Sequence, residues 1–185
     1  TGWSGSWSGS NQVQSPGLTY SGLSVSGNRA AVDGSSASFR DLDQSYSSSS
    51  EIWISFLGQS DSVSPSIWNG IALFNGSTET FFMGVPYQSS SPVKWGLDVK
   101  TGSGTNLSGA NVDSNVTLCV VRIKNNTVTA WTNPSLDGTP SDGSSFVNES
   151  VGSFSFDRVR LEGGSGDTVR YDELRIGNTF EDVTP

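Results

Sequence analysis

The segment Tyr171-Asp-Glu-Leu-Arg-Ile-Gly-Asn-Thr-Phe-Glu-Asp-Val-Thr-Pro185 closes the chain and reads as one β-strand followed by a short exit segment. The strand takes its apolar side chains from four positions: Val169, Tyr171, Leu174 and Ile176. Asp172 and Glu173 put two carboxylates in its middle, although acidic residues are poor strand formers and costly to bury unpaired. These carboxylates therefore require an edge position, a hydrogen-bonding role or a bound cation.

The composition predicts one extracellular β-domain. The chain has 185 residues, of which 33% are hydrophobic and only 15% are charged, together with 22 glycines. Much of the surface must therefore consist of Ser, Thr, Asn, Gln and Gly, which is typical of secreted β-proteins rather than of helical cytoplasmic enzymes. We expect a single domain over residues 1–185, excised from a larger multidomain protein that is secreted or displayed on a cell surface, in which it is a monomeric unit.

The net charge of −8 excludes several classes of partner. Nucleic acids and anionic membranes bind to positive patches, so neither is an expected partner. Long acidic polysaccharides are also disfavoured, unless the ten Lys and Arg residues cluster on one face. No stretch approaches the roughly 18 apolar residues of a transmembrane helix.

The chain contains no histidine and one cysteine. The absence of histidine excludes Ser-His-Asp and Cys-His catalysis as well as His-ligated zinc. Cys119 cannot form an internal disulfide, and its position in the apolar run Val116-Thr-Leu-Cys-Val-Val-Arg-Ile123 predicts a small buried core residue.

Short apolar segments separated by Gly, Asn and Ser turns run along the whole chain and predict β-strands. The expected strands are Leu18–Tyr20, Arg29–Asp33, Ile52–Leu57, Asn69–Gly76, Thr78–Gly84, Lys94–Val99, Leu118–Ile123, Thr127–Thr132, Phe154–Leu161 and Thr168–Ile176. Lys124-Asn-Asn126 predicts a tight hairpin turn, and the last two strands are expected to pair across residues 162–167. No segment of ten residues keeps a helical period, so the pattern favours two packed antiparallel sheets with little or no helix.

An ordered set of short motifs runs through the chain. It comprises Gly2-Trp-Ser-Gly-Ser-Trp7, Ser15-Pro-Gly-Leu-Thr-Tyr20, Ile52-Trp-Ile-Ser-Phe56, Gly70-Ile-Ala-Leu-Phe74, Phe82-Met-Gly84, Trp95-Gly-Leu97, Trp131-Thr-Asn-Pro134 and the closing strand. Together they resemble the laminin-G-like and concanavalin A-like jelly-roll modules of secreted bacterial proteins. The resemblance implies an all-β, two-sheet jelly-roll sandwich. Such modules often stand beside polysaccharide-degrading domains.

Three functions are compatible with this fold, because fold analogy does not by itself transmit function. The predicted function is a non-catalytic carbohydrate-binding module that recognises a polysaccharide or oligosaccharide. An adhesion or spacer domain without a small ligand is the alternative. A glycoside hydrolase or polysaccharide lyase is less well supported, because the chain lacks both histidine and the Glu-x-Asp-x-Glu strand motif of retaining glucanases on this fold.

The predicted ligand surface joins two strands to loop aromatics. Glu79, Phe81 and Met83 are expected to share one strand face, and Lys94, Gly96 and Asp98 to share another, with Trp95 and Leu97 directed into the core. The predicted ligand contacts on these strands and loops are Trp68, Glu79, Tyr87, Lys94 and Asp98. Arg122 is a further candidate, with a salt bridge as its alternative role.

A calcium ion is the only cofactor that the sequence suggests. In jelly rolls similar to this one, a structural Ca²⁺ is held where the first and last strands meet, by a last-strand aspartate and backbone carbonyls. Asp172 matches that aspartate. The alternative is a carboxylate that accepts hydrogen bonds from neighbouring backbone N–H groups or pairs with Arg170 or Arg175.

Overall fold

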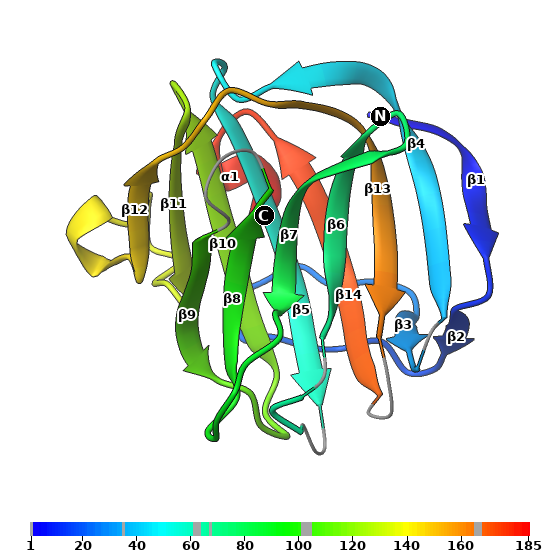
Figure 1. The fold of residues 1–185 in the computed structure, drawn as a ribbon. Coiled ribbons are helices and arrows are strands. Elements are labelled where there is room, and N and C mark those ends of the chain that lie inside the picture. Colours follow the sequence, from blue (N-terminus) through cyan, green and yellow to red (C-terminus); the bar gives the residue numbers. More distant parts are fainter. Residues whose placement is uncertain (1, 35, 61–63, 67, 101–104, 165–167) are drawn as a thin grey trace.

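The computed structural model describes residues 2–34, 36–60, 64–66, 68–100, 105–164 and 168–185, and for residues 105–108 it describes the backbone alone. Within these residues the strands form two antiparallel sheets that face each other (Figure 1). In spatial order, sheet A contains β1 (Trp3–Gly9), β4 (Ala37–Ser47), β13 (Ser155–Gly163), β6 (Asn69–Asn75), β7 (Thr78–Val85), β8 (Lys94–Val99) and β9 (Thr105–Asn111). Sheet B contains β12 (Val147–Ser150), β11 (Thr127–Thr132), β10 (Thr117–Lys124), β5 (Ile52–Ser60), β14 (Val169–Gly177), β3 (Arg29–Val32) and β2 (Gln12–Gln14).

Helix is confined, in the described part of the chain, to the 3-10 turn η1 (Asp142–Ser144) and the short α1 (Phe180–Val183). The predicted two-sheet sandwich with little helix is therefore confirmed. None of the helices among the described residues has the length and apolarity of a membrane span.

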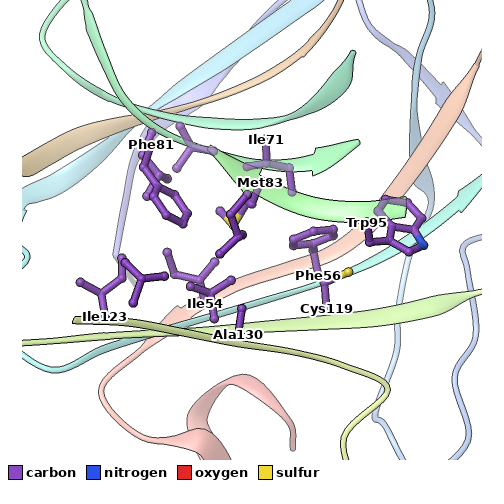
Figure 2. Packing of buried hydrophobic residues seen from close by; sticks show 14 of the residues in the cluster. Ile54, Phe56, Ile71, Phe81, Met83, Trp95, Cys119, Ile123 and Ala130 are labelled. Atoms are coloured by element: carbon purple, nitrogen blue, oxygen red, sulfur yellow. The ribbon is translucent and has the colours of Figure 1, made fainter. Parts of the chain in front are cut away.

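The core fills the space between the sheets, as the alternation of side chains along each strand requires. Figure 2 shows apolar side chains of both sheets interdigitating in this layer. Sheet A contributes Ile71, Phe81, Met83 and Trp95, and sheet B contributes Ile54, Phe56, Cys119, Ile123 and Ala130. The prediction that Cys119 is a buried core residue is confirmed, since its exposed fraction is 6%.

The outer face of sheet B is also buried at its central strands. Leu118 and Val120, which alternate with Cys119 along β10, belong to a second apolar cluster that includes the loop residue Leu18 and Phe180 of α1. A capping box holds α1 in place, with the Thr179 hydroxyl accepting from the Asp182 N–H over 3.2 Å. This second cluster covers the outer face of β10 at Leu118 and Val120.

The central hairpin forms as predicted. β10 pairs with β11 from Cys119 opposite Thr132 to Lys124 opposite Thr127. Asn125 and Asn126 form the turn, with φ values of 50° and 57°. Asparagine is one of the few residues that adopts these left-handed angles readily.

Two strand predictions were wrong. Residues 18–20 form no strand, because Leu18 instead packs on the outer face of sheet B. The last two strands do not pair: β13 lies between β4 and β6 in sheet A, and β14 lies between β5 and β3 in sheet B. A strand that follows another in sequence can cross to the opposite sheet, and local turn signals do not distinguish this crossing from a hairpin.

Candidate functional site

A pocket of about 310 Å³ lies on the outer face of sheet A. Its lining combines aromatic and charged side chains from β7, β8 and β13 and from the segments around them: Trp68, Glu79, Phe82, Pro86, Tyr87, Asp98, Lys100 and Glu162. Four of the six predicted ligand contacts are among them, namely Trp68, Glu79, Tyr87 and Asp98. We call this pocket the sheet-A pocket.

An irregularity in β7 directs Glu79 into the sheet-A pocket. Opposite β6, Phe81 pairs with Leu73 but Glu79 pairs with Phe74, so Thr80 is an extra residue in the ladder and its hydroxyl donates to the Leu73 carbonyl over 3.1 Å. Such a bulge reverses the alternation of side chains. The prediction that Glu79, Phe81 and Met83 share a face was therefore wrong, because Phe81 and Met83 are in the core.

Strand β8 supplies Asp98 to the pocket, and the side chains of this strand alternate regularly. Trp95, Leu97 and Val99 are core residues, so the prediction that Asp98 faces the other way is confirmed. Lys100 continues the outward series and forms ion pairs with Asp98 and, over 3.5 Å, with Glu79. Burial opposes the charge of the Lys100 ammonium, but the hydrogen bond and charges of these two carboxylates outweigh it and raise the pKa of Lys100. Lys100 was not among the predicted ligand contacts, although it lies two residues after Asp98.

Glu162, at the end of β13, forms the opposite wall of the sheet-A pocket. Its side chain is only 4% exposed, and its Oε2 accepts from Arg160 Nε at 2.8 Å. Burial raises the pKa of Glu162; the charge of Arg160 opposes this shift, whereas that of Glu79 adds to it. The alternation of Arg160 and Glu162 with the core residues Val159 and Leu161 was the available sequence signal for this wall.

We expect Glu162→Gln to become more stable relative to wild type as the pH rises. Since the folded pKa of Glu162 lies above its unfolded value of 4.5, the stability that it contributes is complete below that value and is lost as pH rises through the folded pKa. Thermal unfolding of both proteins between pH 3 and pH 7 measures the difference. Glu149→Gln, at an exposed carboxylate of β12, is the control. If Glu162→Gln instead lost stability relative to wild type as the pH rose, the ion pair with Arg160 would outweigh the effect of burial on Glu162.

Two aromatic residues, Trp68 and Tyr87, line the pocket, and neighbouring groups hold Trp68 in place. The Trp68 indole packs against the Gly164 backbone, where a β-carbon would lie 2.0 Å from Nε1, and the Gly164 N–H donates to the Trp68 carbonyl over 2.9 Å. Trp68 also meets Phe82 edge-on, with 6.2 Å between ring centroids. It remains 37% exposed, and Tyr87 is 58% exposed. Both rings are therefore accessible to a ligand.

The structure does not bring Lys94 or Arg122 to this pocket. Lys94 lies on the outward face of β8, beyond the buried Gly96, and its backbone exchanges hydrogen bonds with the Gln88 side chain. Arg122 lies on sheet B, where its guanidinium is 5.6 Å from the Trp53 ring centroid and pairs with Asp142 at 2.9 Å. This arrangement corresponds to the salt-bridge alternative for Arg122.

Asp172 lies at an irregularity in β14, which is a strand of sheet B, and it does not line the sheet-A pocket. Its Oδ2 accepts from the Leu18 N–H over 2.7 Å and its Oδ1 accepts from the Glu173 N–H over 2.9 Å. No group of three or more His, Cys, Asp or Glu side chains that could hold a metal ion occurs among the described residues. The described contacts of Asp172 thus match the hydrogen-bonding alternative. They do not supply the six to eight oxygen ligands of Ca²⁺.

Comparisons with known proteins identify the fold. No protein-family model and no curated protein matches the chain. Among solved structures, the Emp46p carbohydrate recognition domain in its metal-free form is 10% identical, with a TM-score of 0.56 over 94% of this chain and 88% of that one. The exoplasmic/lumenal domain of VIP36, in its Ca²⁺/Man-bound form, is 10% identical, with a TM-score of 0.54 over 94% and 83%. The chain has the concanavalin A-like jelly-roll fold.

Enzymes share this fold as well. The polysaccharide lyase family 18 protein aly-SJ02 is 6% identical, with a TM-score of 0.53 over 78% of this chain and 81% of that one. Since a carbohydrate recognition domain and a polysaccharide lyase both match at 10% identity or less, the fold alone does not select between binding and catalysis.

Proposed function

We propose that this chain is a non-catalytic carbohydrate-binding module that recognises a neutral or weakly charged polysaccharide. The sheet-A pocket carries the proposal, because it places two accessible aromatic rings, Trp68 and Tyr87, beside a fixed set of charged hydrogen-bonding groups. Ligand pockets combine apolar surface with a few oriented polar groups in this way, and the volume of about 310 Å³ is at the lower end of their usual range.

The charges of the pocket favour sugar hydroxyls over anionic groups. Glu79, Asp98 and Glu162 present carboxylate oxygens that can accept from hydroxyl groups, and Lys100 can donate. Three carboxylates around one lysine would repel a ligand with a negative charge on each sugar. A neutral or weakly charged chain fits the pocket better.

The same ion pairs argue against catalysis. Glu79 and Asp98 share the Lys100 ammonium and Glu162 binds Arg160, so each of these carboxylates already has a cationic partner. A general acid or base must exchange a proton with the substrate, and an ion pair makes a carboxylate less available for that exchange. Extracellular placement, a bacterial source and a neighbouring polysaccharide-degrading domain are parts of the proposal that rest on composition and resemblance. The proposal requires no metal ion.

The test begins with a panel of insoluble polysaccharides and soluble glycans, followed by calorimetric titration of the glycans that bind. We expect Trp68→Ala and Tyr87→Ala each to weaken binding by about 30-fold, the equivalent of about 2 kcal/mol for a central aromatic contact. Phe39→Ala is the matched control, since Phe39 is 40% exposed and lies outside this pocket.

Each contrary outcome has a definite meaning. Binding that survives both aromatic substitutions unchanged would move the site away from the sheet-A pocket. Failure to bind any neutral glycan would favour the spacer function. Release of reducing or unsaturated ends from a polysaccharide by the purified chain would show an enzyme instead.

A further inference from the structure

A second pocket, of about 370 Å³, is lined in part by residues of β1 and β2. These are edge strands of the two sheets, and they lie at one flank of the sandwich (Figure 1). We call it the flank pocket. The side chains that matter for its chemistry are Trp3, Trp7, Asn11, Arg29 and Arg40. They come from both sheets and from the residues that connect them, and none of them lines the sheet-A pocket.

Arg29 and Arg40 lack the carboxylate partner that the other arginines with described partners have. Four arginines pair with carboxylates within 4 Å: Arg122 with Asp142, Arg158 with Asp41, Arg160 with Glu162 and Arg175 with Glu173. Among the described residues, Arg29 and Arg40 form no such pair. The Nε atom of each is buried without a hydrogen-bond partner, as is that of Arg122, which pairs through its Nη2 atom instead. Both of these unpaired cations line the flank pocket.

Arg40 occupies a position that normally takes an apolar residue. It alternates with the core residue Leu42 along β4 and stands opposite Val159 of β13. Its guanidinium lies 5.1 Å from the ring centroid of Trp3. A cation partly removed from water without a counter-ion is costly, so a ligand that supplies the counter-ion would be favoured there.

The acidic residues of the flank pocket are already occupied by other groups. Asp172 accepts from two backbone N–H groups, and although the charge of Arg29 acts on it, the two described side chains form no ion pair within 4 Å. Glu173 accepts from the Ser26 N–H and pairs with Arg175 at 2.6 Å. The donor capacity of Arg29 and Arg40 is therefore left for a group from outside the chain.

An aromatic surface borders these cations. The rings of Trp3 and Trp7 lie 5.8 Å apart at an interplanar angle of 44°, and Trp7 is 39% exposed. The Oδ1 atom of Asn11 is buried without a partner, which adds an unused acceptor next to the unused donors. The flank pocket thus offers a ring surface, two guanidinium groups and an amide oxygen in one place.

We infer that the flank pocket is a second glycan-binding site, which takes a sugar unit that carries a carboxylate, as in a uronic acid. Guanidinium groups bind carboxylates through paired N–H donors, a planar ring face of the sugar can pack on Trp7, and Asn11 can accept from a hydroxyl. The inference goes beyond the proposed function, because the sheet-A pocket is lined by carboxylates and suits a neutral sugar. The two cations gather locally even though the chain as a whole carries a net charge of −8.

The test is calorimetric titration at physiological ionic strength with pentamers of galacturonate and of mannuronate, compared with their methyl esters. The esters keep the rings but remove the charge. We expect at least one acidic pentamer to bind and its ester to bind at least tenfold more weakly. Arg29→Gln and Arg40→Gln should each weaken binding about 10- to 100-fold, as for a hydrogen bond between charged groups. Arg158→Gln, at an arginine paired with Asp41, and Trp68→Ala should leave it unchanged.

Several results would overturn the inference: no binding of either pentamer, equal binding of the ester, binding of a sulfated dextran pentamer in place of the uronates, or an equal loss in Arg158→Gln. Because Arg40 faces inward, its variant is checked by thermal unfolding. If it is unstable, Arg29→Gln and Trp7→Ala decide the question, together with the shift of the Trp7 indole N–H resonance on titration. Loss of neutral-glycan binding in Trp68→Ala reports on the sheet-A pocket alone, so the two proposals fail independently.

Discussion

The thiol of Cys119 should react with a disulfide reagent at least about a thousandfold more slowly than free cysteine under native conditions. Cys119 lies on the core face of β10 and is 6% exposed. Burial also raises the pKa of the thiol well above its usual range, which removes the reactive thiolate. Reaction then requires opening of a central strand, and central strands open with free energies that approach the global stability of several kcal/mol.

The measurement follows release of the chromophore from Ellman's reagent, first without denaturant and then in increasing urea. The control is Ser50→Cys in a Cys119→Ala background, which places a thiol in an exposed turn between β4 and β5. This thiol should react at about the rate of free cysteine. Fast reaction of the native protein at Cys119 would show that this face of β10 is not in the core.

Replacing Gly58 by valine should destabilise the protein by about 3 kcal/mol or more, at the upper end of overpacking effects. Gly58 follows Ile52, Ile54 and Phe56 on the inward face of β5. A β-carbon at Gly58 would lie 2.3 Å from the Trp95 ring, which fills this position from sheet A. Trp95 is only 1% exposed, so its ring has no room to move away.

Urea unfolding tests this interpretation by comparing wild type, Gly58→Val, Trp95→Leu and the double variant. The double variant Gly58→Val/Trp95→Leu should be less destabilised than the sum of the two single changes, because the smaller side chain at 95 leaves room for the larger one at 58. Gly143→Ala serves as the control and should change stability by less than about 0.5 kcal/mol, since a β-carbon at Gly143 would meet nothing within 4 Å. Additive effects would show that Gly58 and Trp95 do not compete for space.

The strand pattern was readable from the sequence because a half-buried strand must alternate its side chains. The Asn-Asn turn after Lys124, the core side of β8 and the buried position of Cys119 all follow from local patterns and from intrinsic backbone preferences. The same local patterns identified Asp98 as outward-facing. They also singled out Trp68 and Tyr87 as loop aromatics, and both line the sheet-A pocket.

Glu79 shows where local patterns fail. Glu79 was predicted as a ligand contact because regular alternation would put it on one face with Phe81 and Met83. That face is in the core. The bulge at Thr80 brings it to the outer face, and this bulge exists because β7 must pair with β6 while keeping Phe81 between the sheets. Glu79 therefore lines the sheet-A pocket, whereas the strand face predicted for it from the sequence was wrong.

By itself the sequence determined the fold class, since turn chemistry and a period of two are properties of short segments. Only the tertiary structure decided which strands share a sheet, so that β13 and β14 part after residue 163 and carry Glu162 and Asp172 to different sites. It also decided that Arg122 faces a covered surface and that Arg29 and Arg40 meet at the flank. Pairing between residues far apart in the chain depends on packing of whole sheets, and no short segment encodes that packing.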